Sequence, residues 1–340
     1  MFAGAVRRCE KVARWFVVPD CRPVRSWFAI PAMGLACGGV AIALGLSPAL
    51  ALTGAALAAT VRALAGDSPA ALAGAVIAPA LAVASFAEAG DPGPHAALAL
   101  AAAGWAIAEL ARAPGAGAPA IVAALPAAAA AILDPSFVGL VAIAGVRLVT
   151  APGPRPRWAL AVPAAGAVAI ALAVGAGARW PALAAPWFAR AAHPVALRSL
   201  VALAGDTLGP LTAVAALAGL ISLARSLGTE LADLVPRTRW LPGFGATVRP
   251  ETPGFARLAL AAAVAGALLV DLRAGAPGHA TVGLAAALSG LAIARLARMI
   301  RIPSGQAIAG ATIGALVVAP TAWTAVELRA AAAHIGHASR

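Results

Sequence analysis

The sequence predicts an all-α protein, a polytopic transmembrane helix bundle of about 10–11 spans with its N-terminus in the cytoplasm. Hydrophobic residues make up 62% of the 340 residues, only 11% are charged, and the mean hydropathy is +0.90. A soluble domain has about 25% charged residues. Apolar runs long enough to cross a bilayer recur along the chain, and cations gather in alternate loops between them. Too few polar side chains are present to cover a water-facing surface, so lipid must surround most of the protein.

The first segment, residues 1–26, is basic and mixes its cations with Trp15 and Phe16. This pattern is typical of a short amphipathic helix that lies on an anionic inner leaflet. The charged stretch is too long for the n-region of a cleavable signal peptide, and the apolar run after it is long enough to span. We therefore expect an uncleaved signal anchor.

A membrane domain is predicted over residues 27–327, followed by a C-terminal tail at 328–340. Ser68-Pro69 and Asp134-Pro135 each supply an N-cap followed by proline at the first helical position, so helices are expected to begin there. The two short spans that meet at Asp134-Pro135 also suit a re-entrant hairpin. The candidate spans are 27–45, 48–64, 69–86, 95–110, 119–133, 135–148, 158–177, 208–223, 258–270, 281–296 and 304–326.

The orientation follows from the distribution of lysine and arginine. With the N-terminus in the cytoplasm, 19 of the 25 cations fall in cytoplasmic segments and 6 fall outside. This asymmetry is what the positive-inside rule requires of a bacterial inner-membrane protein. The arginines are spread through short loops, so the net charge of +12 indicates membrane orientation and not a nucleic-acid partner.

Two predicted connections are long enough to carry a function. The inner one covers residues 225–257, and the outer one covers residues 179–207, where tryptophans stand beside arginines as in an interfacial segment. An ordinary interfacial connection is the simpler interpretation of both. If the outer one binds a substrate, the candidate residues are Arg179, Arg190, His193 and Arg198.

Ionisable residues are nearly absent from the predicted spans. Arg62, Glu109 and Arg147 lie near span ends, from where their side chains are expected to reach the interface. The lack of an acid at the centre of any span argues against a proton- or sodium-coupled transporter. No nucleotide-binding motif occurs, and the histidines and cysteines show no metal-ligand spacing, so we expect no cofactor and no metal.

Acidic residues at the predicted outer edge are the candidates for chemistry. Glu88 and Asp91, in the turn after the third span, are candidate catalytic residues, because a carboxylate at the membrane edge can act as a general base. A plain polar turn explains them as well. Asp134 and Asp206 have a structural role available as helix caps. Gly34xxxGly38 and Gly310xxxGly314 fit the small-xxx-small pattern of helix packing.

Two stretches resemble the type C membrane glycosyltransferases, in particular the bacterial protein O-mannosyltransferase-like branch. They are LRSLVALAGDTLGPLTAVAALAGLISLAR (197–225) and AVASFAEAGDPGPHAALALAAAGWAIAELAR (82–112). The resemblance implies a polyprenyl-linked sugar donor and an outward catalytic acid. That family carries its catalytic acid on the first outer loop, and here that loop, 45–48, has none.

Three functions remain open at this point. The first is a non-catalytic structural or assembly subunit that packs against membrane partners through small-residue faces. The second is a glycosyltransferase-like enzyme, with Glu88 or Asp91 as the base and the outer-loop arginines on the phosphate of a polyprenyl-phosphate lipid. The third is a transporter or flippase of a lipid-like substrate. All three place the chain in a bilayer, and none involves nucleic acid.

Overall fold

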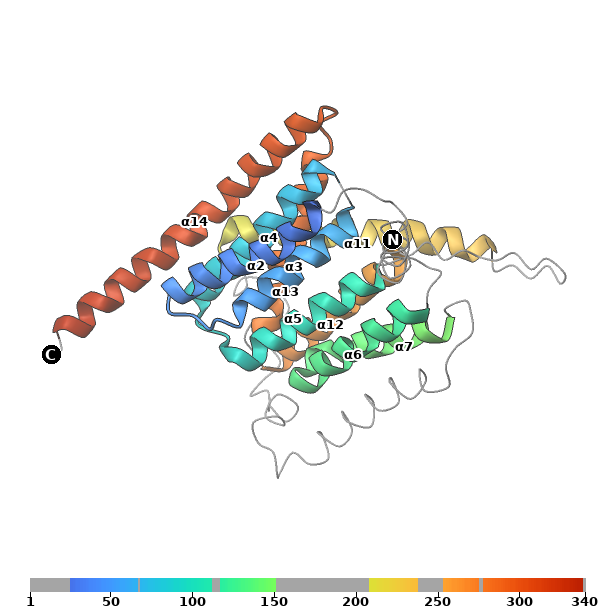
Figure 1. The fold of residues 1–340 in the computed structure, drawn as a ribbon, viewed down its shortest axis with the longest axis horizontal. Coiled ribbons are helices and arrows are strands. Elements are labelled where there is room, and N and C mark those ends of the chain that lie inside the picture. The colour runs from blue at the N-terminus through green and yellow to red at the C-terminus, as the bar shows by residue number, and fades with distance from the viewer. Residues whose placement is uncertain are drawn as a thin grey trace, which may run out of the picture.

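The computed structural model describes residues 25–66, 68–111, 117–150, 208–237, 253–274 and 278–338, and over these ranges it is an all-α bundle without a strand (Figure 1). The all-α class is therefore confirmed for the described residues. The helices are α2 (Arg25–Ala43), α3 (Leu50–Ala65), α4 (Pro69–Ala89), α5 (Gly93–Leu110), α6 (Gly117–Leu133), the 3-10 turn η1 (Pro135–Phe137), α7 (Val138–Thr150), α11 (Pro210–Arg237), α12 (Pro253–Ala274), α13 (His279–Ala297) and α14 (Pro303–Ala338).

Several of these helices can cross a membrane. Five of them, α4, α11, α12, α13 and α14, are long and apolar enough by length and composition. Shorter apolar stretches lie in α2, α3, α6 and α7. All of these segments are unsuited to water, and the five long ones match the thickness of a hydrocarbon core. The chain is a multi-pass membrane protein.

Two helices, α11 and α14, extend far beyond the predicted spans. α11 continues past residue 223 to Arg237, so helix occupies part of the predicted inner connection, and α14 continues to Ala338 through most of the predicted tail. Hydropathy marks where an apolar run ends, but leucine, alanine, arginine and glutamate keep a backbone helical beyond that point. The predicted span 158–177, the outer connection 179–207 and residues 1–24 lie outside the described residues.

Both predicted N-caps are confirmed. The backbone N–H of Ala71 donates to Oγ of Ser68 (3.1 Å), and Pro69 begins α4. The backbone N–H of Ser136 donates to Oδ1 of Asp134 (2.9 Å) as η1 begins. Each cap satisfies a backbone donor that the first helical turn leaves unpaired.

The centre of the bundle is formed by α4 and α13, each with 78% of its candidate span buried. Glycines allow this close contact. A Cβ atom added to Gly74 would lie 2.3 Å from the carbonyl oxygen of Gly290, and one added to Gly290 would lie 2.7 Å from that of Gly74. Because the neighbouring atoms are backbone and cannot move aside, only glycine fits at these two positions.

Both small-residue motifs pack inside the chain. Gly34 and Gly38 face α3, where added Cβ atoms would lie within 2.9 Å of Ala51 or Ala55. Gly310 and Gly314 face α4, and added Cβ atoms would meet Ala73 at 2.5 Å and Ile77 at 1.9 Å. In lipid, small residues let helix backbones approach closely. The motifs thus join α2 to α3 and α14 to α4, and neither is left for a partner.

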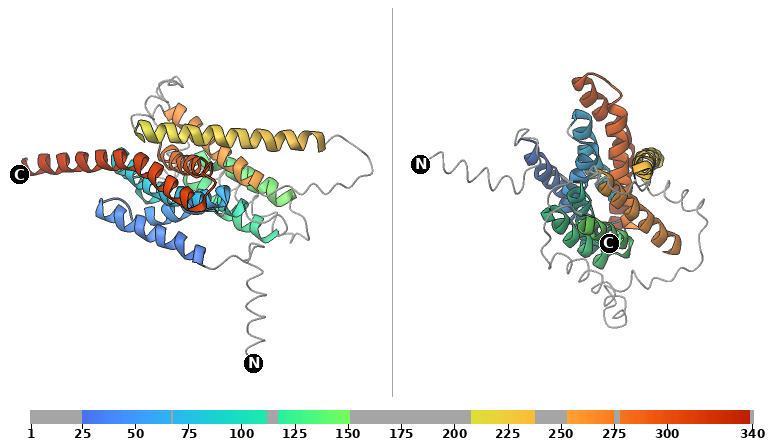
Figure 2. Two further views of the ribbon diagram at one scale, coloured as in Figure 1. Left: turned by 90° about the horizontal axis from the view of Figure 1, so that it is seen from above. Right: turned by 90° about the vertical axis from the view of Figure 1, so that its right-hand side faces the viewer.

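Two helices lie at the outside of the bundle. α11 runs along one side, and α14 extends beyond its neighbours toward the C-terminus (Figure 2). Their candidate spans are only 17% and 22% buried, respectively. At about 1.5 Å per residue, the 36 residues of α14 span about 54 Å, which exceeds a hydrocarbon core of about 30 Å.

The connections between helices lie at two ends of opposite character. At one, here called the acidic end, lie Asp91 after α4, Asp134 after α6, Asp271 in the last turn of α12 and His279 at the start of α13. The other is called the arginine end, and lies where α3 and α13 finish and α12 begins. The arginines near it are Arg62, Arg147, Arg257, Arg295 and Arg298.

Candidate functional site

Asp91, a candidate catalytic residue, forms a structural contact. The backbone N–H of Ser47, in the turn between α2 and α3, donates to its Oδ1 (2.9 Å). The carboxylate therefore joins the first turn at the acidic end to the turn after α4. Asp91 itself remains exposed. One of its oxygens accepts this hydrogen bond, so Asp91 has a structural role that does not depend on catalysis.

Glu88, the other candidate, lies in the last turn of α4 and is half-buried. Its Oε2 atom is buried and has no hydrogen-bond partner among the described residues. A buried carboxylate oxygen without a donor is costly, and a catalytic role is one of the explanations for such a group. Both candidates therefore keep a carboxylate oxygen that can accept a proton, buried in Glu88 and exposed in Asp91.

A second tie at the acidic end was not predicted from the sequence. Asp271, with 1% of its surface exposed, accepts a hydrogen bond from the backbone N–H of Gly278 (2.8 Å) and a short one from the Thr281 hydroxyl. The contact closes the connection from α12 to α13. The sequence signal for this contact is an acid, Asp271, shortly before a glycine-containing connection. A polar loop that makes no such contact would show the same pattern.

His279 lies where these turns meet. Its ring packs against Phe86 of α4, with ring centroids 6.1 Å apart. Asp134 and Asp91 lie close enough to interact with it electrostatically. Groups from three turns therefore gather around one imidazole. No group of three or more metal-ligand residues forms within the described ranges. Among the described residues, the acidic end thus offers carboxylates and an imidazole as proton acceptors and no metal-binding cluster.

The predicted substrate-binding residues cannot be placed beside this end. Arg179, Arg190, His193 and Arg198 all lie outside the residues that the structure describes. Their role remains a prediction.

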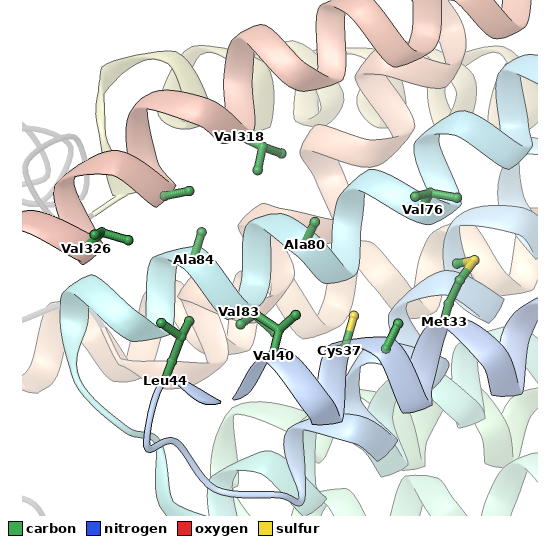
Figure 3. A pocket seen from close by; sticks show the side chains of 12 residues that line it. Met33, Cys37, Val40, Leu44, Val76, Ala80, Val83, Ala84, Val318 and Val326 are labelled. Carbon is green, nitrogen blue, oxygen red and sulfur yellow. The ribbon is translucent and has the colours of Figure 1, made fainter. Parts of the chain in front are cut away.

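An apolar groove lies between α2, α4 and α14 (Figure 3). It has a volume of about 420 Å³ and α4 forms its floor, with α2 on one side and α14 on the other. Its lining is entirely apolar and includes many small residues, so it suits a hydrocarbon chain or an apolar helix. The lining residues are Met33, Ala36, Cys37, Val40, Leu44, Val76, Ala80, Val83, Ala84, Val318, Ala322 and Val326.

A polar cavity of about 350 Å³ lies at the arginine end, between α3, α11, α12 and α13. Arg257, Arg295 and Arg298 line it together with Ser222 and Ser226. From the sequence, these arginines predicted only the orientation of the chain in the membrane. In the sequence, the four-residue spacing of Ser222 and Ser226 and the three-residue spacing of Arg295 and Arg298 place each pair on one helix face, but neither spacing shows that the two pairs meet.

Two ionisable residues predicted to reach the interface are instead buried. Arg147 is 2% exposed and Glu109 is 3% exposed, and both interact within the protein. The guanidinium carbon of Arg147 lies 5.2 Å from the ring centroid of Phe255. The aromatic face and protein contacts compensate a charge that lipid would not tolerate.

No family model, no curated protein and no solved structure matches this chain. The resemblance to the glycosyltransferases therefore stays a prediction, and the functional argument rests on the chain's own residues.

Proposed function

We propose that this multi-pass membrane protein is a non-catalytic assembly subunit that binds the transmembrane helix of a partner membrane protein along α14. The observation that carries the proposal is the outer face of α14. Ala311 and Ala315 are exposed there, at a helical spacing that continues through Val318 to Ala322 in the wall of the apolar groove. This row of Ala311, Ala315, Val318 and Ala322, here called the alanine face, thus leads into an apolar groove.

Packing energetics favours a helix as the occupant of this face. Within lipid, helices associate through close van der Waals contact, which small residues permit, because lipid tails are as apolar as leucine. The glycines of α14 already pack against α4, and its candidate span is still only 22% buried. Among the described residues, nothing covers Ala311 and Ala315, so the alanine face is a second packing surface on the same helix.

Site-specific photo-crosslinking tests the proposal. A photoreactive residue is placed at Ala315 of α14 or, as a matched control, at Ala218 of α11, which is also exposed on a candidate span. We expect one protein adduct of constant mass at position 315 and none at 218. Lipid adducts alone at position 315, a second copy of this chain, or the same adducts at both positions would overturn the proposal.

A pair of substitutions gives an independent test. Ala311→Leu together with Ala315→Leu adds bulk to the exposed face without meeting the internal α4 contact. We expect the crosslinked complex to be lost while the variant elutes as the wild type does. The control pair, Ala218→Leu with Ala224→Leu on exposed positions of α11, should leave the complex intact.

A second candidate is the glycosyltransferase-like enzyme, and the buried, unpartnered oxygen of Glu88 beside Asp91 favours it. In that case Glu88 acts as the base for transfer from a polyprenyl-linked donor. Glu88→Gln with Asp91→Asn should then abolish sugar transfer in isolated membranes, whereas Glu327→Gln, on α14, should not. Unchanged transfer in the double variant would remove this candidate.

We further propose a bacterial inner-membrane location with the N-terminus in the cytoplasm. The support is the distribution of cations, 19 of 25 in the predicted cytoplasmic segments, together with the positive-inside rule. In this orientation the arginine end faces the cytoplasm and the acidic end faces outward.

A further inference from the structure

The cavity at the arginine end combines three positive charges with an apolar wall. Arg257, Arg295 and Arg298 line it, and no acidic residue does so among the described residues. Leu223 and Met299 contribute apolar surface, and Met299 is 80% exposed at the cavity's edge. A cavity with arginines on one part and apolar side chains on another is amphipathic, like a phospholipid.

The close packing of α11 on α13 forms this cavity. A Cβ atom on Gly219 would lie 2.1 Å from the carbonyl oxygen of Leu288, so only glycine allows the two backbones to meet. Two turns farther along α13, Nη1 of Arg295 donates to the carbonyl oxygen of Ser222 (3.0 Å) and to Oγ of Ser226 (3.0 Å). These contacts hold the guanidinium in place.

Arg298 is held from the other side of the cavity. Its Nε donates to Oγ of Ser68 (3.0 Å), and its Nη2 lies 3.4 Å from where a Cβ of Gly66 would stand. A guanidinium has five N–H donors. The contacts of Arg295 use Nη1 and those of Arg298 use Nε, so both side chains are fixed in position with further donors remaining for a ligand.

We propose that this cavity binds the phosphate of an anionic phospholipid, with Arg257, Arg295 and Arg298 as the headgroup ligands. Guanidinium groups match phosphate oxygens through paired N–H donors, which a lysine cannot reproduce. Basic cavities between membrane helices recognise lipid headgroups in this way. The exposed Met299 and the leucines beside the arginines favour a lipid over a free anion, because they offer a surface to its acyl chains.

Lipid binding to the purified, full-length protein tests this inference. Native mass spectrometry in a neutral detergent compares phosphatidylglycerol with phosphatidylcholine, and a parallel thermal unfolding series adds inorganic phosphate alone. We expect phosphatidylglycerol to bind about tenfold or more tightly than phosphatidylcholine. Equal binding of the two lipids would overturn the proposal. If inorganic phosphate stabilised the protein as much as phosphatidylglycerol does, the ligand would be a free phosphate and not a lipid headgroup.

Matched variants separate the cavity from general surface charge. Arg295→Gln with Arg298→Gln removes two charges from the cavity, and Arg225→Gln with Arg301→Gln removes two exposed charges near the same end that do not line it. We expect the first pair to weaken phosphatidylglycerol binding about tenfold or more and the second to change it little. If both pairs lost the same affinity for phosphatidylglycerol, binding would depend on overall surface charge and not on this cavity. Arg295→Lys keeps the charge and should lose part of the affinity, which shows that the planar donor pair matters.

Discussion

The hydroxyl of Thr60 on α3 donates a hydrogen bond to the carbonyl oxygen of Gly104 on α5 at 2.8 Å. About two turns earlier, the hydroxyl of Thr53 donates to the carbonyl oxygen of Ala97 at 2.7 Å. In both pairs the residues are 44 positions apart, so the two helices run parallel and in register. Buried hydroxyls thus connect helices that are not neighbours in the sequence.

Removing one of these hydroxyls should lower stability modestly. Thr60→Val keeps the side-chain shape and deletes the interhelical donor. We expect a loss of about 0.6–1.7 kcal/mol in the free energy of unfolding, since hydrogen bonds between membrane helices contribute about this much. Unfolding of the purified protein in mild detergent with added denaturant measures it. Thr312→Val, at an exposed position of α14, is the control and should be near neutral.

The contact of α4 with α13 should tolerate no added methyl group. Gly74→Ala places a Cβ atom 2.3 Å from the carbonyl oxygen of Gly290, so the helices must move apart. We expect about 1–3 kcal/mol of destabilisation from this overpacking. Gly39→Ala in α2 meets nothing within 4 Å and should be neutral or stabilising by up to about 1 kcal/mol. Equal melting temperatures for the two variants would contradict the close contact.

Asp271 should stabilise the connection from α12 to α13. Asp271→Ala leaves the backbone N–H of Gly278 and the hydroxyl of Thr281 without their acceptor, at an expected cost of about 1–3 kcal/mol. Asp271→Asn keeps one acceptor oxygen and should recover part of this loss. Thermal unfolding compares the two variants. If alanine and asparagine were equally well tolerated, the hydrogen bonds of Asp271 would contribute little to the stability of the protein.

The two ends should lie on opposite sides of the membrane. Single cysteines are introduced as Asp91→Cys or Arg301→Cys after Cys9, Cys21 and Cys37 have been replaced by alanine. In intact spheroplasts, a thiol reagent that cannot cross the membrane should label position 91, whereas position 301 should react only after permeabilisation. Labelling of both from outside would contradict the alternation of the helices. The reverse pattern would keep the alternation and overturn the orientation.

Much of the fold could be predicted from the sequence because hydrophobicity and capping are local properties. The apolar runs located the helices within a few residues, and Ser68 and Asp134 capped them as expected. The ends of α11 and α14 could not be predicted in this way. Residues with high helix propensity follow the apolar run there, so each helix continues beyond the last apolar residue of the predicted span.

The candidate site could be predicted only in part. Glu88 and Asp91 were selected as outward acids, and the structure places Asp91 and Asp134 near His279 and gives Asp91 a structural contact. The arginine cavity was missed, because its residues come from separate helices and each arginine alone fits the orientation pattern. Juxtaposition across helices is not visible in spacing along one helix.

The sequence by itself determined that this protein belongs in a membrane, because its shortage of charge is a property of composition that no packing can change. Which helix face meets which was decided only in the tertiary structure. The helices are apolar on nearly every side, so many pairings bury the same surface, and the choice falls to close contacts such as Gly74 with Gly290. These contacts leave the alanine face of α14 uncovered and bring Arg295 and Arg298 to one cavity.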